Sequence, residues 1–239
     1  MSVLVADPAV KADPRLIVPL DLPTVAEARA IVDALGAAVS FYKVGLELFA
    51  TGGGMDFAKA LKAEGKQVFL DWKLHDIGAT VQKAASVLAG SGCDFVTVHG
   101  EPQVMEAAVR GRGRSSLKIL AVTVLTSLSD ADLIEVGYDV TARALVERRI
   151  HQALTAGCDG VVASPHEAEL ARSIGGKDFL VVTPGVRPDW SAKNDQARAA
   201  TPADALRAGA SHIVCGRPIT GANDPMEAAR RVVAEMAGV

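Results

Sequence analysis

Aromatic residues are scarce in this chain of 239 residues, at 4% of the sequence, although 49% of its residues are hydrophobic. The core therefore consists mainly of Val, Leu, Ile and Ala, which suit parallel sheets and the helices packed on them. Cysteine is also rare. Cys93, Cys158 and Cys215 cannot all pair with one another, and they lack the spacing of metal ligands. We expect three small buried thiols in a reducing compartment.

Neither sign of charge dominates. Lys and Arg total 25 against 28 Asp and Glu, a formal net charge of −3, which gives no electrostatic footprint for nucleic acid or an anionic membrane. The one basic run, RGRGRSSLK (110–118), fits a solvated loop between a helix and a strand. We therefore expect neither a nucleic-acid nor a membrane partner.

Long apolar runs are missing as well. No stretch is long enough to span a bilayer, and the first residues lack the charged and apolar blocks of a secretory signal. These features predict a soluble, cytoplasmic protein. We expect a flexible N-terminal tail over residues 1–14 and one catalytic domain over residues 15–239.

What the sequence does contain is an alternation of short β-branched runs with longer amphipathic ones. Helix candidates such as 24–36, 53–65 and 141–157 end in Gly, which closes helices in the left-handed conformation. The strand candidates are continuous apolar runs, typical of a parallel sheet covered on both faces. They are 15–21, 40–45, 67–73, 94–100, 118–126, 159–164, 178–185 and 211–216.

Eight such units in a chain of this length predict an α/β fold, a single-domain (β/α)₈ TIM barrel. The main rival is a doubly wound open sheet, but its Gly-rich fingerprint does not follow the first strand, and TGGG (51–54) lacks the required spacing. The longest irregular stretch, 183–202, lies between the last two predicted strands. A loop of that length is usually functional or disordered.

Barrels carry their chemistry at the carboxyl ends of the strands. Taken singly, an Asp after a strand often caps the next helix, and a Lys there can simply extend to solvent. Four charges at one mouth are harder to attribute to chance, because isolated buried ions are costly and must pair. An alternating acidic and basic array satisfies that requirement and is typical of active sites. Its members are Asp21, Lys43, Asp71 and Lys73.

The residues near the end of the chain indicate an anion-binding site. Gly216 and Arg217 follow the last predicted strand, where barrels commonly bind phosphate. Gly216 allows close backbone approach, and Arg217 offers the forked donor that suits phosphate oxygens. Arg187 and Gln196, on the long preceding loop, are placed to close over the same group.

These residues resemble a known family. The pattern Asp-x-Lys-x-x-Asp-Ile-x-x-Thr, from Asp71 to Thr80, is similar to the signature of the orotidine 5′-phosphate decarboxylases. The core motif is shared with a wider group of sugar-phosphate decarboxylases and aldolases, whereas six matching blocks in order are more specific. The other blocks are LDL (20–22), YKVGLELF (42–49), VTVLTS (122–127), TPGVRP (183–188) and CGRPIT (215–220).

The resemblance implies conversion of orotidine 5′-phosphate to UMP and CO₂ in de novo pyrimidine biosynthesis. It implies that Lys73 protonates C6 as general acid, with Asp71, Asp76 and Lys43 as the other catalytic residues. No metal and no organic cofactor is implied.

The resemblance also implies how the substrate is held. Asp76 and Thr80 would reach into the site of a partner subunit, so that the functional unit is a homodimer. Thr126 and Ser127 would lie beside the pyrimidine. The phosphate would be held by Arg187, Gln196, Gly216 and Arg217. Asp21, Lys43 and Asp71, members of the charged network, would also bind the substrate.

The sequence departs from the family pattern at Gly78, where many members carry Pro, and we expect a looser start of the following helix. Pro19 lies inside the first predicted strand, where it removes a hydrogen-bond donor. Neither change removes a charged member of the predicted site.

Two other functions fit parts of the sequence. A Mg²⁺-dependent sugar-phosphate decarboxylase or aldolase of the same superfamily would need an acidic ligand set, and Lys43 occupies space where such a set wants a carboxylate or a neutral residue. A non-catalytic barrel that binds a nucleotide phosphate would need the phosphate grip but not four alternating charges.

Overall fold

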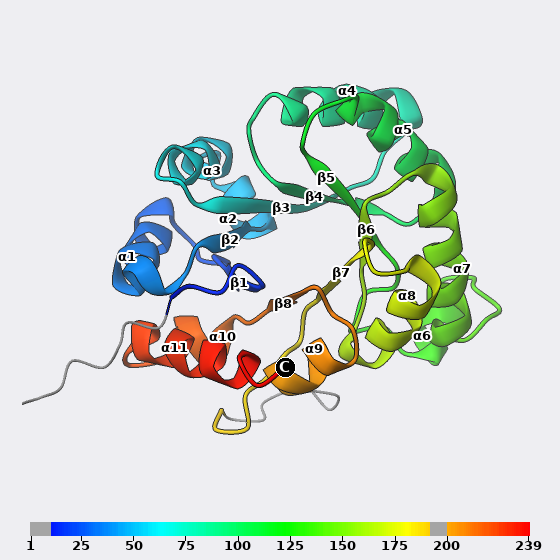
Figure 1. The fold of residues 1–239 in the computed structure, drawn as a ribbon. Helices are drawn as coiled ribbons and strands as arrows, with labels where there is room; N and C mark the ends of the chain where they lie inside the picture. Colours follow the sequence, from blue (N-terminus) through cyan, green and yellow to red (C-terminus); the bar gives the residue numbers. More distant parts are fainter. Residues whose placement is uncertain (1–10, 192–199) are drawn as a thin grey trace, which may run out of the picture.

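The computed structural model describes residues 11–191 and 200–239, and within them eight parallel strands close into a barrel in the order of the sequence. The prediction of a (β/α)₈ barrel is confirmed (Figure 1). The strands are Leu16–Pro19 (β1), Phe41–Val44 (β2), Gln67–Leu74 (β3), Phe95–His99 (β4), Lys118–Val122 (β5), Gly160–Val162 (β6), Leu180–Thr183 (β7) and His212–Val214 (β8).

Helices form a ring around the strands (Figure 1). The α-helices are Val25–Leu35 (α1), Leu46–Ala50 (α2), Gly54–Ala63 (α3), Gly78–Ala89 (α4), Pro102–Arg112 (α5), Asp130–Glu135 (α6), Ala142–Ala156 (α7), Ala168–Gly175 (α8), Pro202–Arg207 (α9), Arg217–Thr220 (α10) and Pro225–Met236 (α11). Short 3₁₀ turns lie at Gly36–Ala38 and Pro165–Glu167. In the described part of the chain, no helix has the length and apolar character needed to cross a membrane.

The core has two layers. The larger layer fills the space between the strands and the helices, where Cys93, Cys158 and Cys215 are buried as free thiols. The smaller layer lies inside the barrel, and its buried members are Ile17, Phe41, Phe69, Phe95, Leu120, Val182 and Val214. Three of the ten aromatic residues, Phe41, Phe69 and Phe95, fill the barrel interior.

Two aspartates with the same local sequence, Cys-Asp before a strand, tie neighbouring strands together. Asp94 precedes β4 and accepts a hydrogen bond of 2.7 Å from the backbone N–H of Val68 in β3. Asp159 precedes β6 and accepts one of 2.9 Å from the N–H of Ile119 in β5. Each carboxylate therefore satisfies a backbone donor near the start of the adjacent strand.

The prediction that the basic run 110–118 is a solvated loop is wrong for both ends of the run. Helix α5 continues through Arg112, and the guanidinium of this residue forms an ion pair with Asp159. At the other end of the run, Lys118 begins β5 and pairs with the same carboxylate at 3.1 Å. Asp159 thus forms ion pairs with both basic residues.

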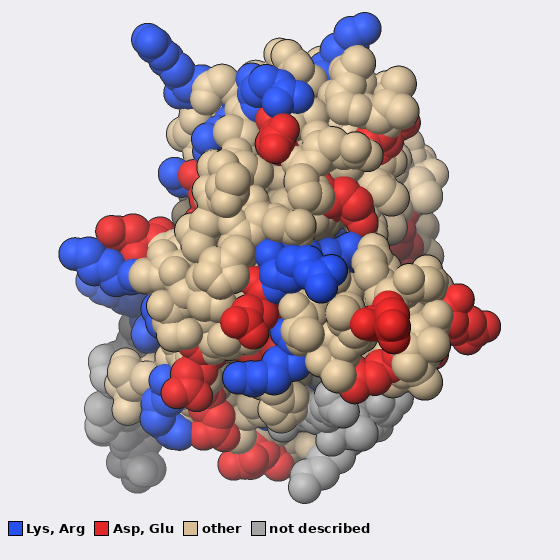
Figure 2. All heavy atoms as spheres, turned by 90° about the vertical axis from the view of Figure 1, so that its right-hand side faces the viewer, with Lys and Arg blue, Asp and Glu red and all other residues tan. Residues whose placement is uncertain are grey.

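Charges of both signs are mixed on the surface. Lys and Arg lie among Asp and Glu across the face shown in Figure 2, as expected for a small net charge.

The fifth strand is shorter than predicted, because the apolar run from 118 to 126 continues past the end of its neighbour. Val122 is the last residue of β5, and it pairs with Val162, the last residue of β6. The N–H of Thr123 still donates a hydrogen bond of 3.3 Å to the carbonyl of Val162, and the chain then continues as a loop. Thr126 and Ser127 consequently lie on a loop and not at the end of a strand.

Candidate active site

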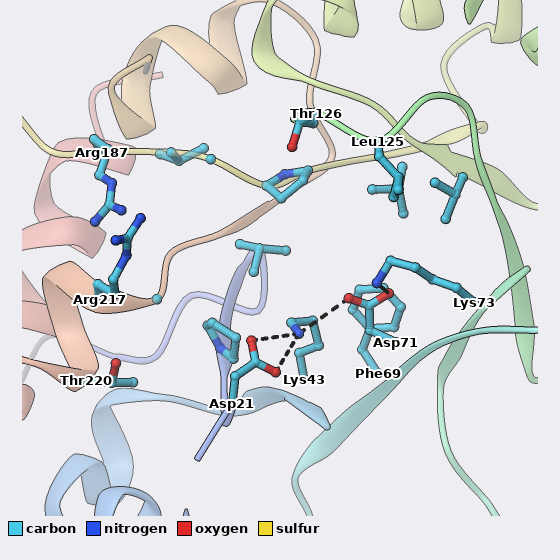
Figure 3. Close-up of a pocket in the computed structure, with 18 of the residues that line it drawn as sticks. Asp21, Lys43, Phe69, Asp71, Lys73, Leu125, Thr126, Arg187, Arg217 and Thr220 are labelled. Atoms are coloured by element: carbon cyan, nitrogen blue, oxygen red, sulfur yellow. Dashed lines mark hydrogen bonds and ion pairs between the residues drawn. The ribbon is translucent and has the colours of Figure 1, made fainter. Parts of the chain in front are cut away.

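A cavity of about 430 Å³ opens at the carboxyl ends of the strands (Figure 3). Phe69 and Val214, which line it, also belong to the apolar layer inside the barrel. The cavity therefore lies directly on the barrel core. The predicted site residues that line it are Asp21, Lys43, Asp71, Lys73, Thr126, Arg187, Gly216 and Arg217.

Asp21, Lys43, Asp71 and Lys73, which we call the charge array, form one continuous chain of ion pairs. The Nζ atom of Lys43 lies 3.0 Å from each carboxylate oxygen of Asp21 and 3.3 Å from Oδ2 of Asp71. The other oxygen of Asp71, Oδ1, lies 2.9 Å from Nζ of Lys73. The structure thus brings all four predicted residues together in alternating order.

The centre of the charge array is buried and its first member is not. The side chains of Lys43 and Asp71 are 10% and 15% exposed, against 47% for Asp21. Burial disfavours the ionised form of Asp71, but the ammonium groups of Lys43 and Lys73, together with hydrogen bonds from Lys73 and Thr97, hold the pKa of Asp71 below its usual value. Asp71 is therefore a carboxylate at neutral pH.

Lys73 has an unusual backbone. It has φ of 48°, in the left-handed region that costs a non-glycine residue about 1–3 kcal/mol. The cause is an irregularity in β3. Leu70 pairs with Val96 and Leu74 with Val98, so three residues of β3 lie opposite a single residue of β4. Bulges of this kind redirect side chains beside active sites.

Two arginines lie at the opposite end of the cavity from Lys73. Arg187 and Arg217 project toward one another from the segments that follow β7 and β8 (Figure 3). Arg187 is buried, and its backbone N–H donates a hydrogen bond of 2.9 Å to the carbonyl of Ala200. Two converging guanidinium groups suit a doubly charged oxyanion such as a phosphate monoester.

The structure gives Gly216 a second reason to be glycine. A Cβ atom at this position would lie 2.8 Å from Cγ of Pro19. Pro19 and Gly216 both line the cavity, next to Arg217. The ring of Pro19 therefore has room in β1 because residue 216 carries no side chain.

Of the predicted site residues that the structure describes, Asp76, Thr80 and Ser127 do not line this cavity. Ser127 lines an adjoining cavity of about 490 Å³, which shares Thr126 and Arg217 with the first. Asp76 and Thr80 are exposed on the connection to α4 and in its first turn, outside both cavities. Gln196 lies outside the residues that the structure describes.

Two residues that bear on the charge array were not predicted. Gly45 follows β2, and a Cβ atom there would lie 2.2 Å from Oδ1 of Asp21. Thr97, in the middle of β4, hydrogen-bonds both Asp71 and Lys73. A polar residue inside the apolar run FVTVH is a signal visible in the sequence, whereas the space requirement at Gly45 is not.

An ammonium group lies between the two carboxylates of the charge array. Among the residues described, no three His, Cys, Asp or Glu side chains come together as metal ligands. The two carboxylates of the charge array share the ammonium of Lys43 between them, at 3.0 and 3.3 Å. That ammonium occupies the position that a cation bridging Asp21 and Asp71 would take.

The fold and the site together define a class: a (β/α)₈ barrel with a buried ionic array at one end of its mouth and an arginine pair at the other, typical of barrel enzymes that act on phosphorylated substrates. The family model described as "Orotidine 5'-phosphate decarboxylase / HUMPS family" matches residues 14–232. The chain belongs to this family, as its sequence motifs predicted.

Similar proteins cover almost the whole chain. The orotidine 5′-phosphate decarboxylase of Caulobacter sp. (strain K31) is 75% identical over 228 residues, which are 95% of this chain and 99% of that protein. The enzyme of the same name from Rhodopseudomonas palustris (strain BisA53) is 53% identical and covers 96% of this chain and 97% of its own length. The crystal structure of orotidine 5′-phosphate decarboxylase from Lactobacillus acidophilus superposes with a TM-score of 0.82 at 39% identity, covering 94% of this chain and 99% of that one.

Proposed function

We propose that this chain decarboxylates orotidine 5′-phosphate to UMP and CO₂. The observation that carries the proposal is the placement of an alternating charge array and an arginine pair at opposite ends of one cavity (Figure 3). A pyrimidine nucleotide has the matching arrangement, with a base that carries a carboxylate at one end and a phosphate at the other. The ribose then lies near Asp21, with the phosphate between Arg187 and Arg217.

The chemical step needs a cation beside C6. Heterolysis of the bond between C6 and the carboxylate carbon releases CO₂ and leaves the electron pair on C6. The ammonium of Lys73 stabilises this developing negative charge, then transfers a proton to C6 as general acid and becomes a neutral amine, which regains a proton from water. Lys73 is suited to this role because its Nζ lies at the end of the charge array, 2.9 Å from Asp71.

Asp71 acts on both lysines. As an ionised group between Lys43 and Lys73 it fixes the two ammonium groups in place. It also lies where the substrate carboxylate approaches, and repulsion between the two carboxylates favours the loss of CO₂. The phosphate, held at the far end, contributes binding energy that stabilises the reactive form of the complex.

The first test is the loss of orotidine 5′-phosphate absorbance on incubation with the purified chain. We expect turnover that is unaffected by EDTA. Lys73→Ala should lower kcat by at least about 10²–10⁴-fold, the range a positioned general acid contributes. Chelator-sensitive turnover would favour the Mg²⁺-dependent sugar-phosphate enzymes, and binding of UMP without turnover would favour a non-catalytic barrel.

The functional unit in this proposal is a homodimer in which Asp76 and Thr80 complete the partner's site. Both residues are exposed and lie outside their own chain's cavity. Ile77, the residue after Asp76, is 70% exposed. Phe49 is 50% exposed and packs on Trp72 of β3, the strand that leads to Asp76. In this proposal the partner subunit covers these apolar side chains.

A mixing experiment separates the partner's contribution from a role within one chain. Lys73→Ala and Asp76→Asn should each be inactive alone. In a mixed dimer the site with an intact Lys73 receives an intact Asp76 from the other chain. Statistical mixing should therefore restore about a quarter of the wild-type activity. Activity that stays at zero after subunit exchange would show that Asp76 acts within its own chain.

A further inference from the structure

Thr97 is a buried polar residue in the middle of β4, directly beneath the charge array. Its side chain has no exposed surface. The Oγ1 atom donates a hydrogen bond of 2.9 Å to Oδ1 of Asp71 and accepts one of 3.0 Å from the backbone N–H of Lys73. Thr97 is not among the described residues that line the cavity, and its hydrogen bonds to Asp71 and Lys73 connect it to the site.

The backbone contact compensates for the irregularity in β3. The three residues between Leu70 and Leu74 face Thr97 alone, so regular strand pairing is interrupted there. A buried N–H without an acceptor is costly, and Lys73 also has the strained φ of 48°. The Thr97 hydroxyl supplies the acceptor, and the strained conformation persists because its surroundings hold it.

The side-chain contact fixes the direction of a catalytic carboxylate. Oδ1 of Asp71 receives the Thr97 hydroxyl and Nζ of Lys73, each at 2.9 Å, while Oδ2 faces Lys43 at 3.3 Å. The side chains of the two lysines are long and flexible. Thr97 is β-branched and lies in a strand, so its hydroxyl is the donor with the least freedom to move among the three that contact Asp71.

We propose that Thr97 is a positioning residue for the decarboxylation: one hydroxyl sets both the orientation of the Asp71 carboxylate and the backbone from which Lys73 approaches C6. This inference rests on the proposed function. A displacement of about 1 Å between reacting groups can cost about 10²-fold in rate. Because the phosphate grip lies at the other end of the cavity, the loss should fall on kcat and leave KM nearly unchanged.

The test compares Thr97→Val, which keeps the shape and removes the hydroxyl, with Thr97→Ser, which keeps the hydroxyl. We expect Thr97→Val to lower kcat by about 10- to 100-fold with KM within about threefold, and Thr97→Ser to remain within about threefold of the wild type in both. UMP affinity, measured by calorimetry, should be unchanged in both variants.

Thr123→Val is the matched control. Thr123 is equally buried, and its hydroxyl donates a hydrogen bond of 2.9 Å to the carbonyl of Val162, away from Asp71 and Lys73. We expect this variant to lose stability but not kcat. If Thr97→Val does not fold, Thr97→Ala takes its place in the comparison with Thr97→Ser.

The outcomes are distinct. A folded Thr97→Val with wild-type kcat, a Thr97→Ser as slow as Thr97→Val, or an equal loss of kcat in Thr123→Val would each overturn the positioning role and leave the proposed function standing. A wild-type chain without turnover of orotidine 5′-phosphate would overturn the proposed function and this inference with it.

Discussion

Asp21 occupies the space in which residue 45 would carry a side chain. A Cβ atom at Gly45 would lie 2.2 Å from Oδ1 of Asp21 and 3.0 Å from Nζ of Lys43. The ion pair between Asp21 and Lys43 is therefore possible only because residue 45, which follows β2, is glycine. A position with no chemical group of its own determines whether the charge array can assemble.

Gly45→Ala should therefore impair catalysis without unfolding the chain. The added methyl group displaces the carboxylate of Asp21, which is half exposed and can rotate away, so the array loses its first member. We expect kcat/KM to fall by at least about 10-fold. Gly90→Ala is the control, since its nearest neighbour would be the carbonyl of Val87 at an ordinary 3.5 Å. Steady-state kinetics of both variants would decide, and a Gly45→Ala enzyme as active as the control would contradict the argument.

Most of this fold could be predicted because parallel strands covered on both faces are continuous apolar runs, and all eight appear where such runs occur. The charge array was predictable for a related reason. Asp21, Lys43 and Asp71 follow or end apolar runs, and in a closed barrel those ends meet. The prediction for β5 was too long, because the apolar run 118–126 extends beyond the end of the neighbouring strand β6.

The contacts that hold the array in place could not be predicted. They depend on register: Thr97 meets Asp71 and Lys73 because β3 carries extra residues between Leu70 and Leu74. Nothing in the order of residues says that Lys73 adopts a positive φ. The apolar pattern of the sequence predicts which residues share a face of the barrel. Which atoms are in contact depends on the irregularity in β3, which the pattern does not reveal.

Arg217→Ala should weaken recognition of the phosphate group alone. We expect kcat/KM for orotidine 5′-phosphate to fall by roughly 10²- to 10³-fold, as when a desolvated charged partner is removed. UMP should bind more weakly, while the affinity for uridine, which lacks the phosphate, should stay the same. Arg207→Ala, at an exposed ion pair with Asp204 outside the cavity, is the matched control. Equal losses for UMP and uridine would remove Arg217 from the phosphate site.

His212 should make the fold sensitive to mild acid. Burial against Phe41 and Phe95 lowers the pKa of His212 to about 4, although Asp13 acts in the opposite direction. The unfolded chain has a normal histidine pKa of about 6.5. Above that pH the ring is neutral in both the folded and the unfolded state, so the protonation of His212 does not reduce the free energy of unfolding. Between pH 6.5 and 4 only the unfolded chain takes up the proton, so stability falls, by at most about 1.4 kcal/mol per pH unit.

Urea unfolding at pH 7 and pH 5 measures this dependence. His212→Gln should flatten it, even if the variant is less stable at pH 7. His151→Gln, at an exposed position of α7, should leave the dependence unchanged. If both variants retained the full wild-type loss between pH 7 and pH 5, the sensitivity would have to come from other groups.

Gly78→Pro should stabilise the chain. Gly78 is the first residue of α4, where the fixed φ of proline matches the helix and its missing N–H is not needed. The preceding residue, Ile77, has φ of −58° and ψ of 146°, the extended conformation that proline requires before it. A side chain has room there, because a Cβ atom would meet that of Ala107 at 3.6 Å.

The expected gain in the free energy of unfolding is about 0.4–1 kcal/mol, because proline reduces the freedom of the unfolded chain. Lys83→Pro, at an exposed position inside the same helix, is the contrasting control and should lose about 3 kcal/mol through a broken helical hydrogen bond. Both are measured by urea unfolding at one protein concentration, since association would also shift the midpoint. A loss of stability in Gly78→Pro would mean that the start of α4 needs the freedom of glycine, and the departure from the family pattern would then be a requirement of this chain and not a weakness.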